Sequence, residues 1–162
     1  MCQIIPSPLL SPIIITMKVL AKNRRATFDY DIGERLIAGV SLSGPEVKSI
    51  KSGFASLKGS FVAIREGEAY LTNAHVTPYT HADHKADIDP TRVRKLLLHR
   101  KQLEELIAHK QSGLSVVPTA LLLDRRLVKV ELGIGRGKKR YDKRETIKRR
   151  DTERELARQV KR

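Results

Sequence analysis

The segment from His81 to Asp89 holds the side chains of this sequence that are best suited to metal chemistry. Two histidines and three aspartates fall within nine positions, and these residue types can hold a zinc ion that activates water. Zinc sites, however, usually take their ligands from regular secondary structure or include cysteines. This segment is polar and is expected to form a loop, so we predict no metal site. A metal-dependent nuclease is kept as an alternative.

A second candidate is the segment from Gly133 to Lys139, which resembles a phosphate-binding loop in composition. A Walker loop needs two glycines five residues apart, followed by lysine and then serine or threonine. Here the glycines alternate, and Lys139 stands where a hydroxyl should hold magnesium. We therefore interpret the segment as a strand that ends in a flexible exit, with amides and lysines that can meet RNA phosphates. A plain hinge is compatible with this interpretation.

The remaining residues give no sign of catalysis. The histidines His75, His99 and His109 are scattered, and each is interpreted as a surface residue or as a polar residue with its hydrogen bonds satisfied. No nucleophile elbow, Ser/His/Asp pattern or paired-carboxylate motif occurs. We predict that the protein is not an enzyme and needs no cofactor.

The charge of the chain predicts a polyanionic partner. Its 32 lysines and arginines against 18 acids give a formal net charge of +14, and nucleic acid is the first candidate, ahead of an anionic membrane surface. From Gly133 to Arg162, 13 basic and five acidic residues leave +8 (13 − 5). Such a basic end is typical of an interaction tail.

The start of the chain is treated apart from the fold. Residues 1–16 are apolar but lack the positive region and cleavage site of a secretory signal, and three prolines interrupt any helix. Nothing apolar is long enough to span a bilayer. Cys2 stands alone, so no intramolecular disulfide can form, which predicts a cytoplasmic protein.

Three basic clusters favour a shared RNA-binding surface. They are Asn23-Arg24-Arg25-Ala26, Thr91-Arg92-Val93-Arg94-Lys95 and Lys138-Lys139-Arg140. Aromatic residues make up only 4% of the chain, which is poor for a platform that stacks single-stranded bases. We therefore expect recognition of RNA shape through phosphate and 2′-hydroxyl contacts.

The first half of the chain predicts strands around one short helix. Residues 28–43 are predicted to form two short strands, with Gly33 and Gly39 as interruptions. Residues 44–53 predict a helix, because Pro45 suits its first position and Gly53 suits its C-terminal end. Residues 60–65 and 69–76 predict a hairpin around the turn Glu66-Gly67.

The second half predicts a helix followed by two strands. Asp89-Pro90 can open a helix, whereas Leu96-Leu97-Leu98 can equally form a short strand. The spacing of apolar residues predicts a helix that Gly113 closes. Residues 114–123 are apolar on both faces, with Pro118 indicating an edge or a bulge, and residues 127–134 alternate.

These elements predict a mainly β fold with short helices. The most consistent architecture is an OB-like closed antiparallel β-barrel with two or three helices and a basic C-terminal tail. Residues 1–16 are interpreted as an N-terminal extension, disordered or upstream of the true start. Residues 17–137 form the predicted RNA-binding barrel, and residues 138–162 the tail, which is expected to be disordered when free.

A series of short motifs runs in order from about Asn23 to Arg150. The motifs are Asn23-Arg24-Arg25-Ala26, Ala38-Gly39-Val40, Gly44-Pro45-Glu46-Val47-Lys48-Ser49, Pro90-Thr91-Arg92, Arg94-Lys95-Leu96-Leu97-Leu98, Lys129-Val130-Glu131-Leu132-Gly133, Gly137-Lys138-Lys139 and Asp142-Lys143-Arg144-Glu145-Thr146-Ile147-Lys148. Each is weak alone, but together they are specific and cover most of the chain. In this combination the sequence resembles the SsrA-binding protein family, SmpB.

The resemblance implies an OB-like barrel that binds the elbow of the tRNA-like domain of transfer-messenger RNA and carries this RNA to stalled ribosomes. It implies that the tail replaces the missing codon–anticodon helix in the decoding centre and follows the empty mRNA channel. We expect the tail to be helical on the ribosome. The implied partners are therefore transfer-messenger RNA and the ribosome, with no membrane and no catalytic activity.

The family pattern ties Asn23, Leu97 and Lys129 to RNA binding. With the basic residues near them, the predicted RNA-binding set is Asn23, Arg24, Arg25, Lys48, Arg94, Lys95, Leu97 and Lys129. The predicted ribosomal A-site and decoding set is Gly137, Lys138, Lys139, Tyr141, Asp142, Lys143 and Arg144.

The sequence departs from the family pattern at three positions. Ile37 stands where glutamate is frequent, Phe28 where histidine is frequent, and Tyr141 where some members have histidine. An aromatic ring can still stack on a base, whereas Ile37 cannot replace a carboxylate, so no role is carried over to Ile37. The alternative function is another basic OB-type ribosomal or translation-associated RNA-binding protein.

Overall fold

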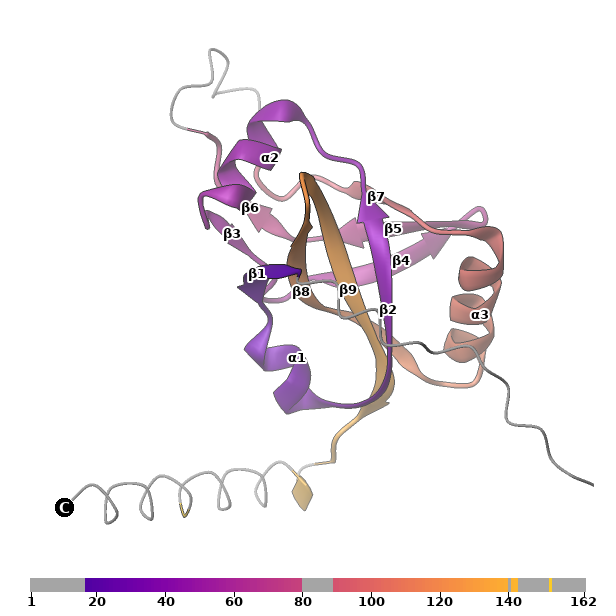
Figure 1. Ribbon diagram of the computed structural model, residues 1–162. Helices are drawn as coiled ribbons and strands as arrows, with labels where there is room; N and C mark the ends of the chain where they lie inside the picture. The colour runs from indigo at the N-terminus through magenta and orange to yellow at the C-terminus, as the bar shows by residue number, and fades with distance from the viewer. Residues whose placement is uncertain (1–16, 80–88, 140, 143–151, 153–162) are drawn as a thin grey trace, which may run out of the picture.

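The computed structural model describes residues 17–79, 89–139, 141, 142 and 152 (Figure 1). Within them the chain is mainly β, with three helices. The elements are β1 (Lys18–Lys22), α1 (Arg24–Asp29), β2 (Tyr30–Val40), α2 (Gly44–Lys51), β3 (Ala55–Ser56), β4 (Phe61–Arg65), β5 (Glu68–Thr72), β6 (His75–Val76), β7 (Arg94–Leu97), α3 (Arg100–Gln111), β8 (Ser115–Asp124) and β9 (Leu127–Gly137).

Seven of the strands form one antiparallel sheet in the order β1-β8-β9-β2-β7-β5-β4, and β3 pairs with β6. The long strands β2, β8 and β9 form its centre, and α1, α2 and α3 lie around it on different sides (Figure 1). The sheet curves so far that Cα atoms of β4, at one end of the order, come within 8 Å of β8, near the other end. Among the described residues, hydrogen-bonded pairing does not join β4 to β1 or β8, so the closed barrel stays a prediction.

The alternation predicted for the last strand is confirmed. Val128, Val130, Leu132 and Ile134 of β9 are all buried, because successive side chains of a strand point to opposite faces. They pack in one core with residues of β4, β5, β7 and β8 and with Leu106 of α3. The predicted hairpin is confirmed for β4 and β5, with Glu66 and Gly67 at φ 51° and 71° in its turn. Its second strand ends at Thr72 rather than at residue 76, because His75–Val76 forms β6 and pairs with β3.

The start of the described chain differs from the prediction. Residues 28–43 do not form two short strands: β2 is one strand of 11 residues, and Gly33 marks a register shift against β9 rather than a break. The strand β1 and the helix α1 were not predicted from the sequence. Pro118 was predicted to indicate an edge strand or a bulge. It marks a bulge, and β8 lies between β1 and β9, so it is not an edge strand.

Two glycines of β9 are required by the close approach of other strands. A Cβ atom on Gly135 would lie 1.9 Å from the carbonyl oxygen of Asp31, and one on Gly133 would lie 2.8 Å from Cγ2 of Thr119. Both glycines are buried and paired with β2. The segment was interpreted as a flexible exit from the sheet. That interpretation is wrong for residues 133–135, which are buried within a strand that continues to Gly137.

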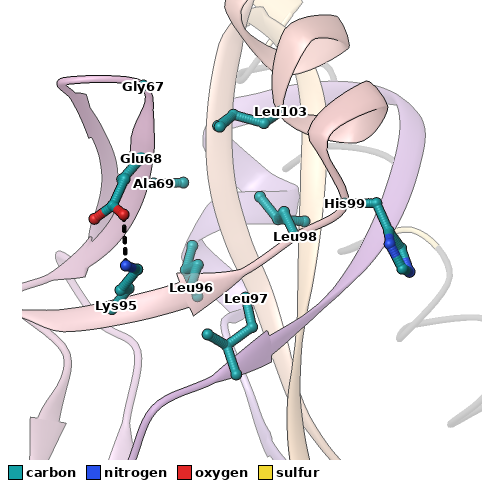
Figure 2. Close-up of a pocket in the computed structure, with 9 residues that line it drawn as sticks. All are labelled: Gly67, Glu68, Ala69, Lys95, Leu96, Leu97, Leu98, His99 and Leu103. Atoms are coloured by element: carbon teal, nitrogen blue, oxygen red, sulfur yellow. Dashed lines mark hydrogen bonds and ion pairs between the residues drawn. The ribbon is translucent and has the colours of Figure 1, made fainter.

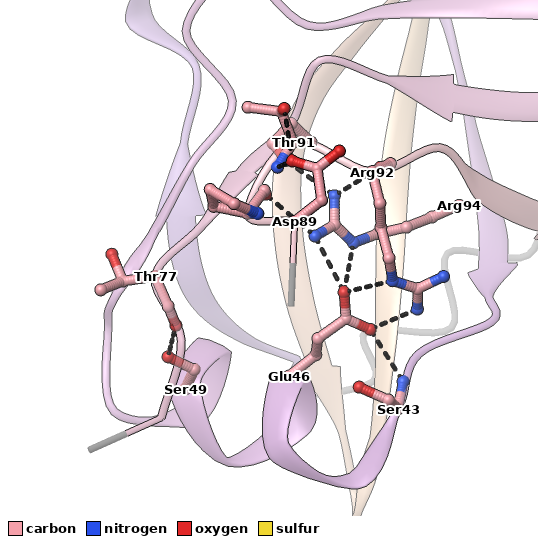
Figure 3. Close-up of polar contacts among 10 residues, drawn as sticks. Ser43, Glu46, Ser49, Thr77, Asp89, Thr91, Arg92 and Arg94 are labelled. Atoms are coloured by element: carbon pink, nitrogen blue, oxygen red, sulfur yellow. Dashed lines mark hydrogen bonds and ion pairs between the residues drawn. The ribbon is translucent and has the colours of Figure 1, made fainter. Parts of the chain in front are cut away.

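The predicted helix over residues 44–53 is α2, and its first turn carries the main buried ion pair (Figure 3). The Glu46 carboxylate is 2% exposed and accepts a hydrogen bond from the backbone N–H of Ser43 (2.8 Å). Nε of Arg92 and Nε of Arg94 donate to Oε1 of the same carboxylate at 2.7 and 2.9 Å. The carboxylate of Glu46 thus joins α2 to the start of β7 and to the residues just before it.

The environment of Glu46 keeps its carboxyl ionised. Burial raises its pKa, but the hydrogen bonds from Arg92 and Ser43 and the charges of Arg94 and Arg92 outweigh burial and leave the pKa at about 2.

No helix in the described part of the chain is long and apolar enough to cross a membrane.

We predict that Glu46→Gln lowers the free energy of unfolding by about 3–5 kcal/mol at neutral pH, because it leaves the Arg94 guanidinium buried without its counter-charge. The folded pKa lies below the unfolded value of 4.5. The stabilisation is therefore complete above pH 4.5 and is lost as the pH falls towards 2. Urea unfolding across this range measures both effects.

The matched control is Glu68→Gln, which removes the acid of an exposed pair with Lys95. It should change the unfolding free energy little, since solvent screens exposed pairs. Equal losses in the two variants would contradict the structural role assigned to Glu46.

Candidate nucleic-acid interface

Asn23 is a buried connector between three segments. Its Nδ2 donates to the carbonyl oxygens of Leu57 (3.0 Å) and Pro118 (2.9 Å), and its Oδ1 accepts from the Ala26 N–H (3.2 Å). It is the N-cap of α1 and is only 7% exposed. Because both Nδ2 hydrogens and Oδ1 are engaged within the protein, Asn23 fixes the position of its neighbours.

The helix α1 presents the next two predicted residues to solvent. Arg24 and Arg25 are exposed, and Arg25 Nε lies 3.3 Å from Oδ2 of Asp29, one turn along the helix. Arg25 remains 68% exposed in this pair. Both guanidinium groups are therefore placed where a phosphate can reach them.

Leu97 and Lys129 lie on either side of Gly39 on one face of the sheet. Gly39 pairs with Leu97 of β7 and with Lys129 of β9, and side chains directly opposite in a sheet share a face. Leu97 is 55% exposed, and Ile37, two residues before Gly39, is also exposed. The structure thus brings together Ile37, Gly39, Leu97 and Lys129, which we call the β2–β7–β9 face.

Two close contacts define the positions of side chains on this face. A Cβ atom on Gly39 would lie 3.1 Å from Cβ of Leu97, so a larger residue would press on the leucine. Lys129 Nζ lies 2.7 Å from Oδ2 of Asp124, across the β8–β9 turn. Asp124 was not identified from the sequence, since nothing local indicates which lysine it meets.

A cleft of about 460 Å³ adjoins Leu97, between β5, β7 and the start of α3 (Figure 2). Lys95 Nζ lies 2.5 Å from Oε1 of Glu68 at its rim, and the Tyr70 hydroxyl donates to Oε2 at 2.6 Å. These two hydrogen bonds lower the pKa of Glu68. The charge of Lys95 is thus locally balanced, although its side chain is exposed.

Arg94 is a correction to the predicted RNA-binding set. Its side chain is 1% exposed, and besides Glu46 it donates to the carbonyl oxygens of Ala74 (2.7 Å), Arg92 (2.9 Å) and Pro90 (3.1 Å). These contacts leave no exposed surface for RNA, so Arg94 is a structural residue. Lys48, by contrast, is exposed on α2, with Nζ 5.6 Å from the centroid of the Tyr79 ring.

The first residues of the predicted tail are held against α1. Gly137 pairs with Tyr30, the Lys138 N–H donates to the carbonyl oxygen of Asp29 (2.8 Å), and Lys138 Nζ donates to that of Thr27 (3.4 Å). The Lys139 N–H donates to Oδ2 of Asp142 (3.0 Å). The tail therefore leaves the sheet from a fixed starting point.

The remaining decoding residues are only partly described. Tyr141 is 64% exposed, whereas Lys143 and Arg144 lie outside the described residues. The His81–Asp89 segment also lies outside them, apart from Asp89. Within the described ranges, no group of three or more His, Cys, Asp or Glu side chains is arranged to hold a metal ion.

Comparison with protein families assigns the chain. The model of the SmpB protein family matches residues 20–162. The chain belongs to the SmpB family. An SsrA-binding protein of Synechococcus sp. (strain JA-2-3B'a(2-13)) is 49% identical over 146 residues, which is 90% of this chain and 95% of the relative. One of Bacillus pumilus is 49% identical over 142 residues, 87% of this chain and 90% of the relative.

A solved structure supports the same SmpB assignment. It is described as "tmRNA-SmpB: a journey to the center of the bacterial ribosome", and one of its chains is 42% identical to this one with a TM-score of 0.62. The match covers 78% of this chain and 92% of the other. The mainly β fold described above is thus shared with an SmpB structure.

We predict that Asn23→Ala lowers the free energy of unfolding by about 1–3 kcal/mol, because it removes the side-chain cap of α1 and the two hydrogen bonds that Nδ2 donates to the carbonyl oxygens of Leu57 and Pro118. Arg24→Ala, next in the chain but exposed, should change it by less than about 0.5 kcal/mol. Urea unfolding of both variants measures the difference. Equal stability of the two would mean that the contacts of Asn23 contribute nothing.

Proposed function

We propose that this protein binds the tRNA-like domain of transfer-messenger RNA and delivers it to stalled ribosomes, in trans-translation. The observation that carries the proposal is membership of the SmpB family along residues 20–162. Its relatives at 46–49% identity are SsrA-binding proteins, and the similar solved structure is of tmRNA-SmpB in the ribosome.

The placement of charge supports a division of labour between the sheet and the tail. Exposed Arg24, Arg25, Lys48 and Leu97, with half-buried Lys129, are held on rigid elements. They are assigned to the folded RNA, because a fixed spacing of contacts can match the shape of a tRNA-like domain. Residues 138–162 form the basic tail, which is assigned to ribosomal RNA of the decoding centre and mRNA channel.

The tail needs the ribosome to become ordered. Fixing a residue costs about 1–2 kcal/mol, and the neutralisation of phosphates by lysine and arginine releases counterions in return. A cationic tail that becomes helical only within an empty channel would detect that the channel is empty. Gly137, Lys138, Lys139, Tyr141, Asp142, Lys143 and Arg144 are assigned to this step.

Two finer features belong to the same proposal. We infer that the curved sheet completes an OB-like barrel, and the approach of β4 to β8 supports this. The protein is assigned a binding role without catalysis, in the cytoplasm, where stalled ribosomes are found.

We predict that truncation after Arg140 leaves affinity for the isolated tRNA-like domain nearly unchanged at fixed salt, whereas Lys129→Ala weakens it by about 1–3 kcal/mol, the scale of a lost charge-assisted contact. Lys110→Ala, which removes the same charge from the exposed face of α3, is the control. Gel-shift titrations compare the proteins. Equal losses in Lys129→Ala and Lys110→Ala would mean that binding follows charge alone and does not depend on the β2–β7–β9 face.

We predict that replacing Asp142, Lys143 and Arg144 together by alanine leaves binding to transfer-messenger RNA normal but severely reduces peptidyl transfer on ribosomes stalled without a codon. These residues follow the fixed start of the tail and would be the first to meet the decoding region, so they nucleate its order.

The control replaces Lys148, Arg149 and Asp151 by alanine, which also removes one acid and two bases. Non-specific electrostatics predicts equal, small effects in both triple variants. Peptidyl transfer by the first variant within a factor of about three of wild type would contradict the assigned role of Asp142, Lys143 and Arg144.

A further inference from the structure

A hollow of about 230 Å³ lies beside α1, and none of the residues that define the β2–β7–β9 face lines it. Three segments enclose it: α1 with the start of β2, residues 59–61, and β8. The lining residues that matter for the argument are Asn23, Arg25, Tyr30, Ser60, Phe61 and Val117. Two of these residues, Asn23 and Arg25, belong to the predicted RNA-binding set. The others have no role assigned so far.

Phe61 gives the hollow an exposed aromatic ring. It is the first residue of β4 and is 49% exposed, whereas its neighbour Val62 is buried in the core. Tyr30, the first residue of β2, also lines the hollow. Aromatic rings of this kind are the usual platforms for unstacked bases of RNA, and the planar guanidinium group of Arg25 is another.

Exposed cations adjoin the lining residues of the hollow in the chain. Lys22 and Arg24 flank Asn23 in the chain, and Lys58 precedes Gly59; all three cations are exposed. Arg25 keeps most of its side chain in solvent although it pairs with Asp29. An apolar ring with cations nearby in the chain is complementary to a nucleotide, whose base is apolar on its faces and whose phosphate is anionic.

Asn23 holds the walls of the hollow together. Its Nδ2 hydrogen bonds reach Leu57, before the 59–61 segment, and Pro118 of β8, while its Oδ1 caps α1. The Ser60 hydroxyl donates to the same Leu57 carbonyl oxygen (2.6 Å). A change at Asn23 would therefore shift Phe61 and the arginines of α1 relative to one another.

We propose that this hollow binds one unstacked nucleotide of the RNA, with the base against Phe61 and the phosphate near Arg24 and Arg25. In this proposal Asn23 acts as a positioning residue. The inference rests on the proposed function, because it takes the tRNA-like domain as the RNA that supplies the nucleotide.

The test compares two exposed phenylalanines. Phe61→Leu removes the ring from the hollow, and Phe54→Leu makes the same change at a residue that is 57% exposed and follows α2. We expect Phe61→Leu to weaken binding of the tRNA-like domain transcript about tenfold. Phe54→Leu should stay within a factor of two, and Phe61→Tyr, which keeps a ring, should bind as wild type does.

A second measurement uses the wild-type protein and so does not depend on the folding of a variant. Transcripts that carry 4-thiouridine are photo-crosslinked to the protein, and the modified peptides are identified by mass spectrometry. We expect crosslinks at Phe61 or Tyr30 from an unpaired nucleotide. Crosslinks that are absent from this hollow, or equal affinities of Phe61→Leu and Phe54→Leu, would overturn the inference.

These outcomes separate the two proposals. If wild type binds the tRNA-like domain but the hollow fails both measurements, only the hollow is wrong. If wild type does not prefer the tRNA-like domain over a ribosomal RNA fragment of equal length, the proposed function is overturned, and the inference that rests on it falls as well.

Discussion

The buried carboxylate of Glu46 is the contact on which the position of β7 depends. This strand is joined to β2 by two residue pairs and to β5 by two others, so its own hydrogen bonds are few. Glu46 adds an ionic link from α2 to Arg92 and Arg94. A buried ion pair contributes little net stability compared with apolar packing, but breaking it is costly because one charge is then left unpaired. The pair therefore acts mainly by fixing one arrangement of α2 and β7.

That arrangement determines which side chains reach the surface. Along β7, Arg94 and Leu96 face inward while Lys95 and Leu97 face outward, as the twofold period of a strand requires. A shift of one residue would bury Lys95 and expose Arg94. Placing Arg94 beside Glu46 excludes that shift. The exposed leucine of the β2–β7–β9 face thus depends on a buried ion pair.

The sequence predicted the elements whose signals are local. The helix α2 has Pro45 and Gly53 at its ends, the β4–β5 hairpin has Glu66-Gly67, and β9 alternates, so each was recognisable without knowledge of its partners. Helix α1 was missed although Asn23 is a favoured N-cap residue, because the basic residues after it were interpreted only as a charged cluster. The family resemblance, rather than periodicity, tied Leu97 and Lys129, together with Asn23, to RNA binding.

The burial of Arg94 could not be predicted from the sequence in the same way. Its cluster, Thr91 to Lys95, contains three cations with no local difference between them. The difference arises only from the approach of α2, which brings Glu46 to Arg92 although 46 residues separate them in the chain. This approach separates the structural arginines from exposed Lys95. The close approach of Asp31 to Gly135 is equally non-local. For this reason a glycine-rich segment that resembled a hinge proved to be mostly a buried strand.

Under the proposed function, affinity and specificity depend on different residues of this protein. A net charge of +14 attracts any RNA, and neutralised phosphates contribute to binding whatever the sequence of that RNA. A preference for one folded RNA requires in addition that cations and apolar contacts keep a fixed spacing. Glu46, Arg94 and Asn23 set this spacing from within the protein, between segments far apart in the chain. Loss of such a residue would alter RNA recognition without removing a single contact to RNA, so a functional effect at a buried position does not identify a binding contact.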